Sequence, residues 1–520
     1  MDMNVKEMSL EQKIGMVLCA RRFREDDVEF IFELVKKRAL GCMQPPAGRP
    51  ELIKDILAAA DYPILVVNDT EQGFPTTDLP KIPLNSLAAC NNPEYCRAYA
   101  KGVVRDAQAA GFNGTWGPVI DILECDGPEK VHRCLSDNPE TIGKLAEEIA
   151  SVYKQNHYLS CGKHYPGSSG LAIDTHMREG FSEHSREYIV EHNLAPYMYL
   201  MEKGLLPTIM VGHTVYRNID PEYPASLSKK VIDIIRELGY DGIIYTDSFA
   251  MMGILQRFGE ENVYGMAIAA GNDIILPNYR RSVKECYDLL MQNYKDGLFT
   301  EERLDEAVRR VLVAQEFVGQ TPKEPTIFTE KDEEMLHNVA RDCITAITDE
   351  GITAALTDEN KEKLFIVMTE NGYEPDTEDA EVQTGLWYHP EIVAKRIRAN
   401  FPEATIEFIP EFSSFRDHER VLNKATGFKE VVVVSFCNTT AYQGTDGLTR
   451  RSEAWINALQ YSGKISAIVH FGNPYALKNI DHIPRRIFGY MITESQKHAI
   501  DVLAGKLEAK GKLPFDIQFN

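Results

Sequence analysis

Two pairs of residues in the stretch KHYPGSSGLAIDTHMREG have side chains suited to acid–base chemistry on a polar substrate. Lys163 and His164 are adjacent and can bind polar groups of a ligand. Asp174 and His176 lie two residues apart, and a carboxylate so placed can orient an imidazole and favour its charged form. The Pro-, Gly- and Ser-rich segment between the pairs is typical of a mobile loop over a pocket. The stretch therefore predicts an enzyme whose acid/base group lies on a loop.

The elements that must position these residues are expected from the apolar pattern of residues 14–277. Strand-length apolar segments recur there, and each is followed by a longer segment with helical periodicity. Several are nearly continuous apolar runs, as in parallel strands buried on both faces. Eight successive units favour a closed (β/α)8 barrel over a doubly wound sheet. The expected strands are residues 15–20, 40–46, 63–69, 112–122, 159–167, 207–213, 241–247 and 272–277.

Ionisable side chains are concentrated where the predicted strands end. Barrels of this kind carry their chemistry at the carboxyl ends of the strands, so side chains from several strands converge on one pocket. Asp247 ends the segment GIIYTD and could be a nucleophile, a general base or a metal ligand. Arg133 precedes a predicted helix and could clamp an anion or form a surface ion pair. The strand-end residues are Asp69, Asp121, Lys163, His164, His213 and Asp247.

The net charge, the apolar runs and the cysteines of the chain indicate which partners and which cellular location to expect. The chain has 520 residues, 44% of them hydrophobic, and a net charge of −22, which argues against nucleic acid or an anionic membrane as the partner. No apolar run is long enough for a membrane span or a signal peptide. The ten cysteines form no CxxC pair, so reduced thiols in a cytoplasmic protein are expected.

A second α/β pattern follows the predicted barrel. We expect a barrel domain over residues 1–320, a Pro-interrupted, charged linker over 321–334, and a smaller domain over 335–520. Apolar strands alternate with helical segments in the last part, which predicts an open sheet with helices on both faces.

Seven segments, in order, resemble glycoside hydrolase family 3, and most closely its bacterial β-N-acetylglucosaminidase branch. The segments are SLEQKIGMVL, DTEQG, GFNGTWGPVIDI, HRCLSDNPE, CGKHYPG with IDTH, LGYDGIIYTDSFAMMGI and AAGNDIIL. The likeness continues more weakly into the second domain through GNPYAL and GKLPFDI.

The resemblance implies a role for each matching residue. Asp247 corresponds to the nucleophile that forms a covalent glycosyl-enzyme, and His176 to the general acid/base, with Asp174 as its partner. The Asp-x-His pair marks the N-acetylglucosaminidase branch, whereas the β-glucosidase branch uses a glutamate. The resemblance implies no metal or organic cofactor and a small carbohydrate substrate, with a role in recycling peptidoglycan fragments. The residues that the resemblance implies hold the sugar hydroxyls are Asp69, Arg133, Lys163 and His164.

The chain departs from the family pattern at three places. Ser168 and Ser169 follow Gly167 where the branch commonly has KHFPGHG. Residues 74–78, FPTTD, replace the usual arginine-containing run, and Ser248 replaces the carboxylate that commonly follows the nucleophile.

Several alternatives remain open at this point. Within the family, the chain could be a β-glucosidase, another β-hexosaminidase, or a phosphorylase that transfers the sugar to phosphate. A catalytically inert sugar-binding relative is a further alternative. A metal-dependent hydrolase using His164, His176, His213 and Asp247 is disfavoured, because the sequence lacks HxH and HExxH spacings.

Overall fold

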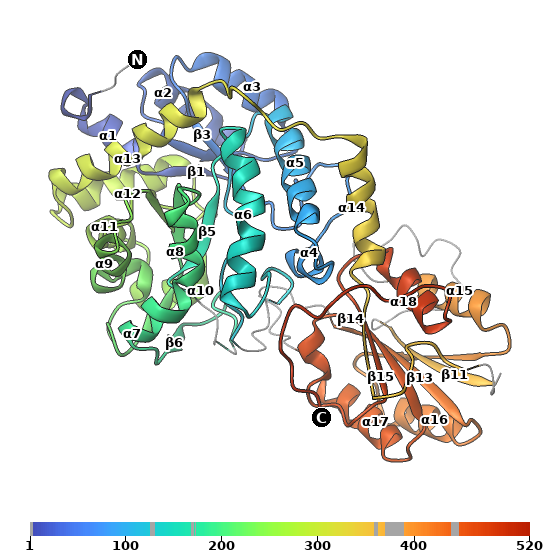
Figure 1. Ribbon diagram of the computed structural model, residues 1–520. Coiled ribbons are helices and arrows are strands. Elements are labelled where there is room, and N and C mark those ends of the chain that lie inside the picture. Colours follow the sequence, from blue (N-terminus) through green and yellow to red (C-terminus); the bar gives the residue numbers. More distant parts are fainter. Residues whose placement is uncertain are drawn as a thin grey trace. The chain divides into compact units, whose positions relative to one another are not determined.

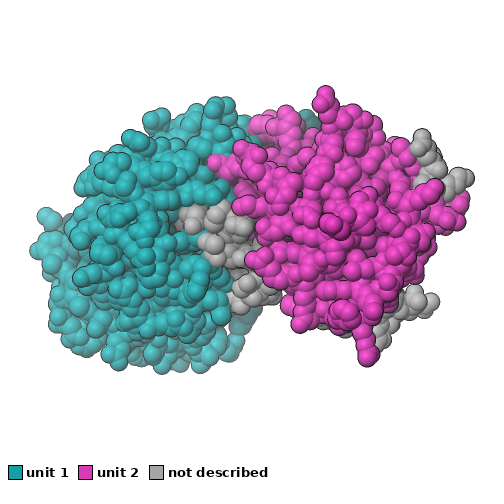
Figure 2. Space-filling model, turned by 90° about the horizontal axis from the view of Figure 1, so that it is seen from below, with its two compact units in different colours: residues 1–79, 96–125, 138–333 teal, residues 80–95, 126–137, 334–520 magenta. Residues whose placement is uncertain are grey.

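The computed structural model describes residues 4–124, 131–167, 171, 173–357, 362–369, 389–437 and 447–520 (Figure 1). The chain forms two compact units (Figure 2). Unit 1 comprises residues 1–79, 96–125 and 138–333, and unit 2 comprises residues 80–95, 126–137 and 334–520. Two short segments from the N-terminal half therefore belong to unit 2, which the sequence pattern does not reveal.

Unit 1 contains the predicted (β/α)8 barrel. Its strands form two parallel sheets, in the orders β1-β2-β3-β4 and β5-β7-β9. Parallel bridges from Gly114 to Leu159, from Tyr245 to Ile274 and from Leu18 to Ile275 join the sheets and close the ring. The regular strands are β1 Cys19–Arg21, β2 Cys42–Gln44, β3 Leu65–Asn68, β4 Gly114–Thr115, β5 Cys161–Tyr165, β7 Thr208–Val211 and β9 Ile243–Thr246.

The eighth barrel position, expected at residues 272–277, is held by isolated bridges rather than by a regular strand. Asp273 explains the difference, because its side chain takes part in the pairing with β9. Its Oδ2 accepts a hydrogen bond of 3.0 Å from the Ile244 amide, while its own amide donates to the Ile244 carbonyl. The closure of the barrel is unaffected.

Helices alternate with the barrel strands, as the sequence pattern predicts. Helix α6 begins after Asn138, whose side chain accepts a hydrogen bond from the Thr141 amide. Ser228 caps α9 in the same way. The helices are α1 Leu10–Met16, α2 Val28–Lys36, α3 Pro50–Ala59, α5 Pro93–Ala109, α6 Pro139–Gln155, α7 Arg186–Tyr188, α8 Ala195–Glu202, α9 Lys229–Glu237, α10 Met252–Phe258, α11 Val263–Ala270, α12 Val283–Lys295 and α13 Glu301–Gly319.

A small two-stranded sheet is inserted beside the barrel. Strand β6 (Gly180–Ser182) pairs in parallel with β8 (Thr214–Tyr216). β6 follows the Asp174–His176 loop, and β8 follows His213 at the end of β7. The pairing therefore fixes the return of the loop to the end of a barrel strand.

Unit 2 contains an open six-stranded sheet in the order β10-β15-β14-β13-β11-β12, parallel except for β10. Helices α15 and α18 cover one face, and α16 and α17 cover the other (Figure 1). Helix α14 (Glu330–Asp342) includes the point in the sequence where unit 1 ends and unit 2 resumes. The other elements of unit 2 are α4 Leu84–Ala89, β10 Thr345–Thr348, β11 Lys363–Thr369, α15 Pro390–Asn400, β12 Thr405–Pro410, α16 Phe415–Ala425, β13 Glu430–Cys437, α17 Arg450–Gln460, β14 Ile465–Gly472, β15 Arg485–Gly489 and α18 Ser495–Leu503. The prediction of a barrel followed by an open α/β sheet is confirmed. Among the described residues, no helix has the length and apolar character needed to cross a bilayer.

Candidate active site

Asp247 follows β9 at the carboxyl end of the barrel strand. Its amide donates to the Val211 carbonyl at 2.8 Å, and its Oδ1 accepts from the Ser248 amide at 2.6 Å. Burial raises the pKa of Asp247, but nearby imidazoles, that of His164 first, outweigh burial and bring the pKa well below its ordinary range. Asp247 is therefore an ionised carboxylate at neutral pH, as a nucleophile requires.

Asp174 and His176 form a closed pair on the loop after β5. Asp174 Oδ1 accepts from the His176 amide at 2.9 Å and lies 2.8 Å from His176 Nδ1. Asp174 is buried, whereas 21% of the His176 side chain is exposed. The carboxylate holds the ring orientation and fixes the proton on Nδ1, which leaves Nε2 as the ring atom for chemistry.

The loop that carries this pair is attached to the segment after Asp247. The Met252 amide donates to the His176 carbonyl at 2.9 Å. Helix α10 approaches the loop so closely that a Cβ on Gly253 would lie 2.5 Å from the Thr175 carbonyl oxygen. The backbones of the two candidate catalytic segments are therefore in direct contact.

Lys163 lies in the middle of β5, and its side chain lies between two carboxylates. Its Nζ is 2.9 Å from Asp69 Oδ1 and 2.7 Å from Glu71 Oε1. Only 2% of the Lys163 side chain is exposed, so these ion pairs offset the loss of its hydration. Asp69 is 42% exposed and remains accessible to a ligand. The structure brings Lys163 and Asp69 together as the sequence pattern suggests.

Asp121 positions His164. The His164 amide donates to Asp121 Oδ1 at 2.8 Å, and His164 Nδ1 lies 2.9 Å from Asp121 Oδ2. Both residues are buried. Asp121 thus fixes the His164 ring through two contacts, and the ring in turn lowers the pKa of Asp247.

His213 is a neutral structural residue. Its Nδ1 lies 2.7 Å from Ser226 Oγ, and its Nε2 lies 3.1 Å from the Ser248 carbonyl oxygen. Nε2 therefore carries the proton, and Nδ1 accepts from the Ser226 hydroxyl. Burial lowers the pKa of His213. A ring with both nitrogens engaged in this way is a poor metal ligand, and the described residues contain no group of three or more His, Cys, Asp or Glu arranged to hold a metal ion.

Arg21, Gln44 and Asn68 form a second polar row that the sequence analysis did not single out. Arg21 donates to Gln44 Oε1 at 2.8 Å and to Ser248 Oγ at 2.6 Å. Gln44 Nε2 donates to Asn68 Oδ1 at 3.1 Å. These residues end β1, β2 and β3. Their signal in the sequence is the one used for Asp69: a polar residue directly after a buried apolar run.

Two sequence expectations are not tested by the geometry of unit 1. Arg133 belongs to a segment of unit 2, and its role as a sugar contact stays a prediction. Ser168 and Ser169 lie outside the described residues. The geometry on unit 1 thus unites Asp247, the Asp174–His176 pair, Lys163 with Asp69, and His164 with Asp121.

Comparison with known proteins shows which family the chain belongs to. The sequence profile of the glycosyl hydrolase family 3 N-terminal domain matches residues 10–314. A protein of Cellulomonas fimi named β-N-acetylglucosaminidase/β-glucosidase is 24% identical over 397 residues, covering 71% of this chain and 70% of that protein. A β-hexosaminidase of Idiomarina loihiensis is 30% identical over 284 residues, covering 52% of this chain and 82% of that protein.

A solved structure extends the likeness to the whole fold. The glycoside hydrolase family 3 β-N-acetylglucosaminidase from Paenibacillus sp. is similar with a TM-score of 0.78 at 21% identity, covering 99% of this chain and 100% of that chain. Unit 2 therefore belongs to the shared fold along with the barrel. The family profile covers more than half of the sequence, and this chain belongs to glycoside hydrolase family 3.

Proposed function

We propose that this glycoside hydrolase is a retaining, exo-acting β-N-acetylglucosaminidase that cleaves terminal β-linked N-acetylglucosamine through a covalent glycosyl-Asp247. The observation that carries the proposal is the Asp174–His176 pair, in which Asp174 Oδ1 lies 2.8 Å from His176 Nδ1. The loop that carries this pair is hydrogen-bonded to the segment after Asp247. The names of the relatives from Cellulomonas and Idiomarina support the same sugar class.

The first step of the proposed reaction uses the ionised carboxylate and the protonated imidazole. An Asp247 oxygen attacks the anomeric carbon while His176 Nε2–H protonates the glycosidic oxygen. The bond from the anomeric carbon to the leaving oxygen breaks, and an acylal ester to Asp247 forms. Asp174 stabilises the imidazolium before transfer and keeps Nε2 directed at the leaving group.

The second step reverses the role of His176. The neutral Nε2 accepts a proton from water, whose oxygen attacks the anomeric carbon as the ester bond to Asp247 breaks. Two displacements at one carbon give net retention of configuration. Every proton and leaving group in this scheme is handled by Asp247, His176 and Asp174.

The sugar is held by the polar residues around the nucleophile. Asp69, Lys163 and His164 are proposed to bind the hydroxyls of the terminal sugar, with Arg133 as a further contact. The biological substrate is proposed to be a peptidoglycan fragment that is recycled in the cytoplasm.

Hydrolysis of 4-nitrophenyl N-acetyl-β-glucosaminide tests the proposal. We expect turnover by the wild type, loss of turnover in Asp247→Asn, and a covalent mass increase on the peptide containing Asp247 after incubation with a slowly turned-over fluorosugar. Faster turnover of the matching β-glucoside contradicts the sugar assignment. Binding of N-acetylglucosamine without turnover between pH 5 and 8 indicates an inert sugar-binding relative instead.

Phosphorolysis is a second candidate, and His176 is the observation that favours it. A neutral imidazole does not repel an incoming phosphate dianion, whereas a carboxylate base in the same place does. Addition of phosphate at constant ionic strength, with sulfate as the matched control, distinguishes the acceptors. A rate that rises with phosphate and yields the sugar 1-phosphate supports phosphorolysis.

A further inference from the structure

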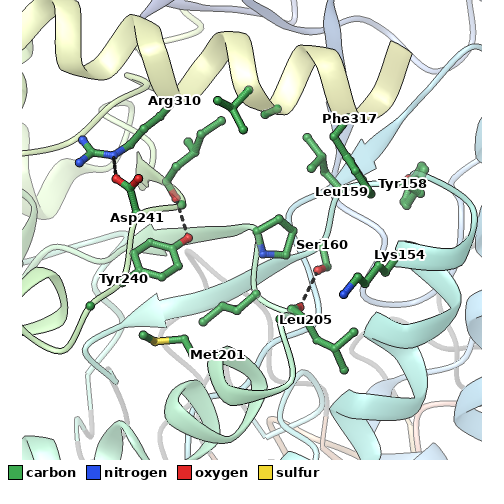
Figure 3. A pocket seen from close by; sticks show the side chains of 18 of the residues that line it. Lys154, Tyr158, Leu159, Ser160, Met201, Leu205, Tyr240, Asp241, Arg310 and Phe317 are labelled. Atoms are coloured by element: carbon green, nitrogen blue, oxygen red, sulfur yellow. Dashed lines mark hydrogen bonds and ion pairs between the residues drawn. The ribbon is translucent and has the colours of Figure 1, made fainter. Parts of the chain in front are cut away.

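The barrel of unit 1 has a pocket of about 490 Å³ at the end opposite the candidate active site (Figure 3). It is formed where β5, β7 and β9 begin and where α13 crosses them. The volume falls within the range of about 300–1,000 Å³ that is usual for small-molecule sites. None of the residues assigned above to catalysis or sugar binding lines it.

The walls of the pocket are mainly apolar. Leu159, Pro207 and Ile243 lie at or next to the starts of β5, β7 and β9, and Leu205 lies in the segment after α8. Val313 and Phe317 come from α13. Val313 is 58% exposed, so a large aliphatic side chain on α13 borders both pocket and solvent. Such walls favour a ligand with an apolar body, because binding removes apolar surface of both partners from water.

Most polar groups of the pocket already have protein partners. Asp241 pairs with Arg309 at 2.7 Å and with Arg310 at 2.9 Å. The Ser160 hydroxyl donates to the Leu205 carbonyl at 3.3 Å, and the Tyr240 hydroxyl donates to the Ile243 carbonyl at 3.0 Å. These groups therefore need no hydrogen bond or ion pair from a ligand.

Two groups are exceptions among the described residues: the buried Tyr158 hydroxyl has no hydrogen-bond partner, and Lys154 makes no ion pair. Within the described part of the chain the Lys154 ammonium group has no carboxylate partner, and Figure 3 shows the Lys154 side chain directed toward Ser160 and Leu205. The ammonium lies close to Gly204: a Cβ there would be 3.4 Å from Lys154 Nζ. The chain has a net charge of −22, so a cation without a carboxylate partner beside an apolar pocket is a local departure from its overall negative charge.

We propose that this pocket binds a small amphipathic organic anion, with its apolar body between the strand starts and α13 and its carboxylate beside Lys154. The charge of the chain as a whole repels anions, so the local cation and the apolar walls must supply the affinity together. Of these strands, β5 carries Lys163 and His164, and β9 leads into Asp247 at its carboxyl end, so the anion and the sugar occupy separate sites.

Calorimetric titration of the full chain with octanoate tests the proposal, with octylamine as a probe of the same length and opposite charge. We expect saturable binding of one octanoate per chain and at least tenfold weaker binding of octylamine. Lys154→Met should weaken octanoate binding at least tenfold, whereas Lys154→Arg retains it. Lys144→Met, an exposed position on the same helix, serves as the matched control and should leave binding unchanged.

A second variant tests the location of the octanoate site without altering the charge of the pocket. Val313→Trp places a bulky ring at the border of the pocket and should reduce octanoate binding while leaving glycosidase turnover intact. Equal affinity for octanoate and octylamine, or full affinity in Lys154→Met, overturns the proposal. Displacement of octanoate by saturating N-acetylglucosamine also overturns it. A drop in sedimentation coefficient on Val313→Arg shows that a second copy of the chain covers the pocket, and likewise overturns it.

Discussion

The His176 carbonyl accepts a hydrogen bond of 2.9 Å from the Met252 amide, so the loop that carries the proposed acid/base is attached to the helix that follows the proposed nucleophile. The next residue, Gly253, allows this contact, since a Cβ there would lie 2.5 Å from the Thr175 carbonyl oxygen and 2.7 Å from that of Arg178. The relative position of the two candidate catalytic segments thus depends on the absence of a side chain at Gly253.

Gly253→Ala is expected to move the loop away from α10 and to lower kcat/KM by about 10²-fold, the effect of an approximately 1 Å misplacement of a catalytic group. In a helix without a clash, replacing Gly by Ala stabilises the fold by about 0.5–1 kcal/mol. Steady-state kinetics and thermal unfolding of the variant therefore separate the two effects. Gly48→Ala, at a position with no neighbour within 4 Å, is the control and should leave both measurements unchanged. Wild-type kinetics in Gly253→Ala contradict the proposed contact.

Asp174→Asn removes the charge that stabilises and orients the His176 imidazolium. We expect a loss of about 10²–10⁴-fold in kcat/KM for substrates with poor leaving groups, the usual contribution of general acid catalysis. For 4-nitrophenyl substrates the loss should be much smaller, since that leaving group departs without a proton. The comparison is made on an N-acetylglucosamine disaccharide and the nitrophenyl glycoside. Equal losses on both substrates point to a binding defect and contradict the acid/base assignment.

Chelators are expected to leave the activity unchanged. His213, one of the four residues that a metal site would need, already uses Nδ1 toward Ser226 and Nε2 toward the Ser248 carbonyl. Dialysis against EDTA, followed by a rate measurement and elemental analysis of the protein, checks the expectation. Loss of activity that zinc restores supports the metal-dependent alternative.

The strand ends of the barrel could be predicted because each buried apolar run stops at a polar residue. Asp69, Lys163, His164 and Asp247 follow from this rule, and the Asp174–His176 pair follows from its spacing. Arg21 obeys the same rule but lies in the run CARRF, where two adjacent arginines look like a solvated turn. The contact between Gly253 and the loop could not be predicted, because it joins backbones 78 residues apart in the sequence (175 and 253). The inclusion of residues 80–95 in unit 2 has no local signal either.

Asp273→Asn is expected to destabilise unit 1 strongly. This fully buried carboxylate accepts from Arg236 at 2.7 Å, from Arg303 at 2.6 Å and from Arg310 at 3.1 Å. Removing one member of a buried ion-pair network costs about 3–5 kcal/mol, because the remaining charges stay buried without compensation. Urea unfolding followed by tryptophan fluorescence measures the loss.

Asp233→Asn is the matched control for this prediction. Asp233 pairs with Lys229 at 2.6 Å on the exposed face of α9, and such i,i+4 pairs contribute only about 0.3–0.5 kcal/mol. The two variants should therefore differ by several-fold in their effect on the free energy of unfolding. Similar urea midpoints for the Asp273→Asn and Asp233→Asn variants refute the role of Asp273 in closing the barrel.

His164 should control the acid limb of the pH–rate profile. Burial raises the pKa of Asp247, but the His164 imidazole is the strongest of the neighbouring charges that hold this pKa below its ordinary value. A positive neighbour favours the ionised carboxylate, so removing it raises the pKa of Asp247. In His164→Gln the acid limb of kcat/KM is therefore expected at higher pH than in the wild type, in addition to any loss of sugar binding. Profiles of kcat/KM from pH 3 to 8 check the shift. The control is His157→Gln, at a half-buried histidine whose Nδ1 lies 3.0 Å from the Gln320 carbonyl oxygen. An acid limb that stays in place while KM rises assigns His164 to sugar binding alone.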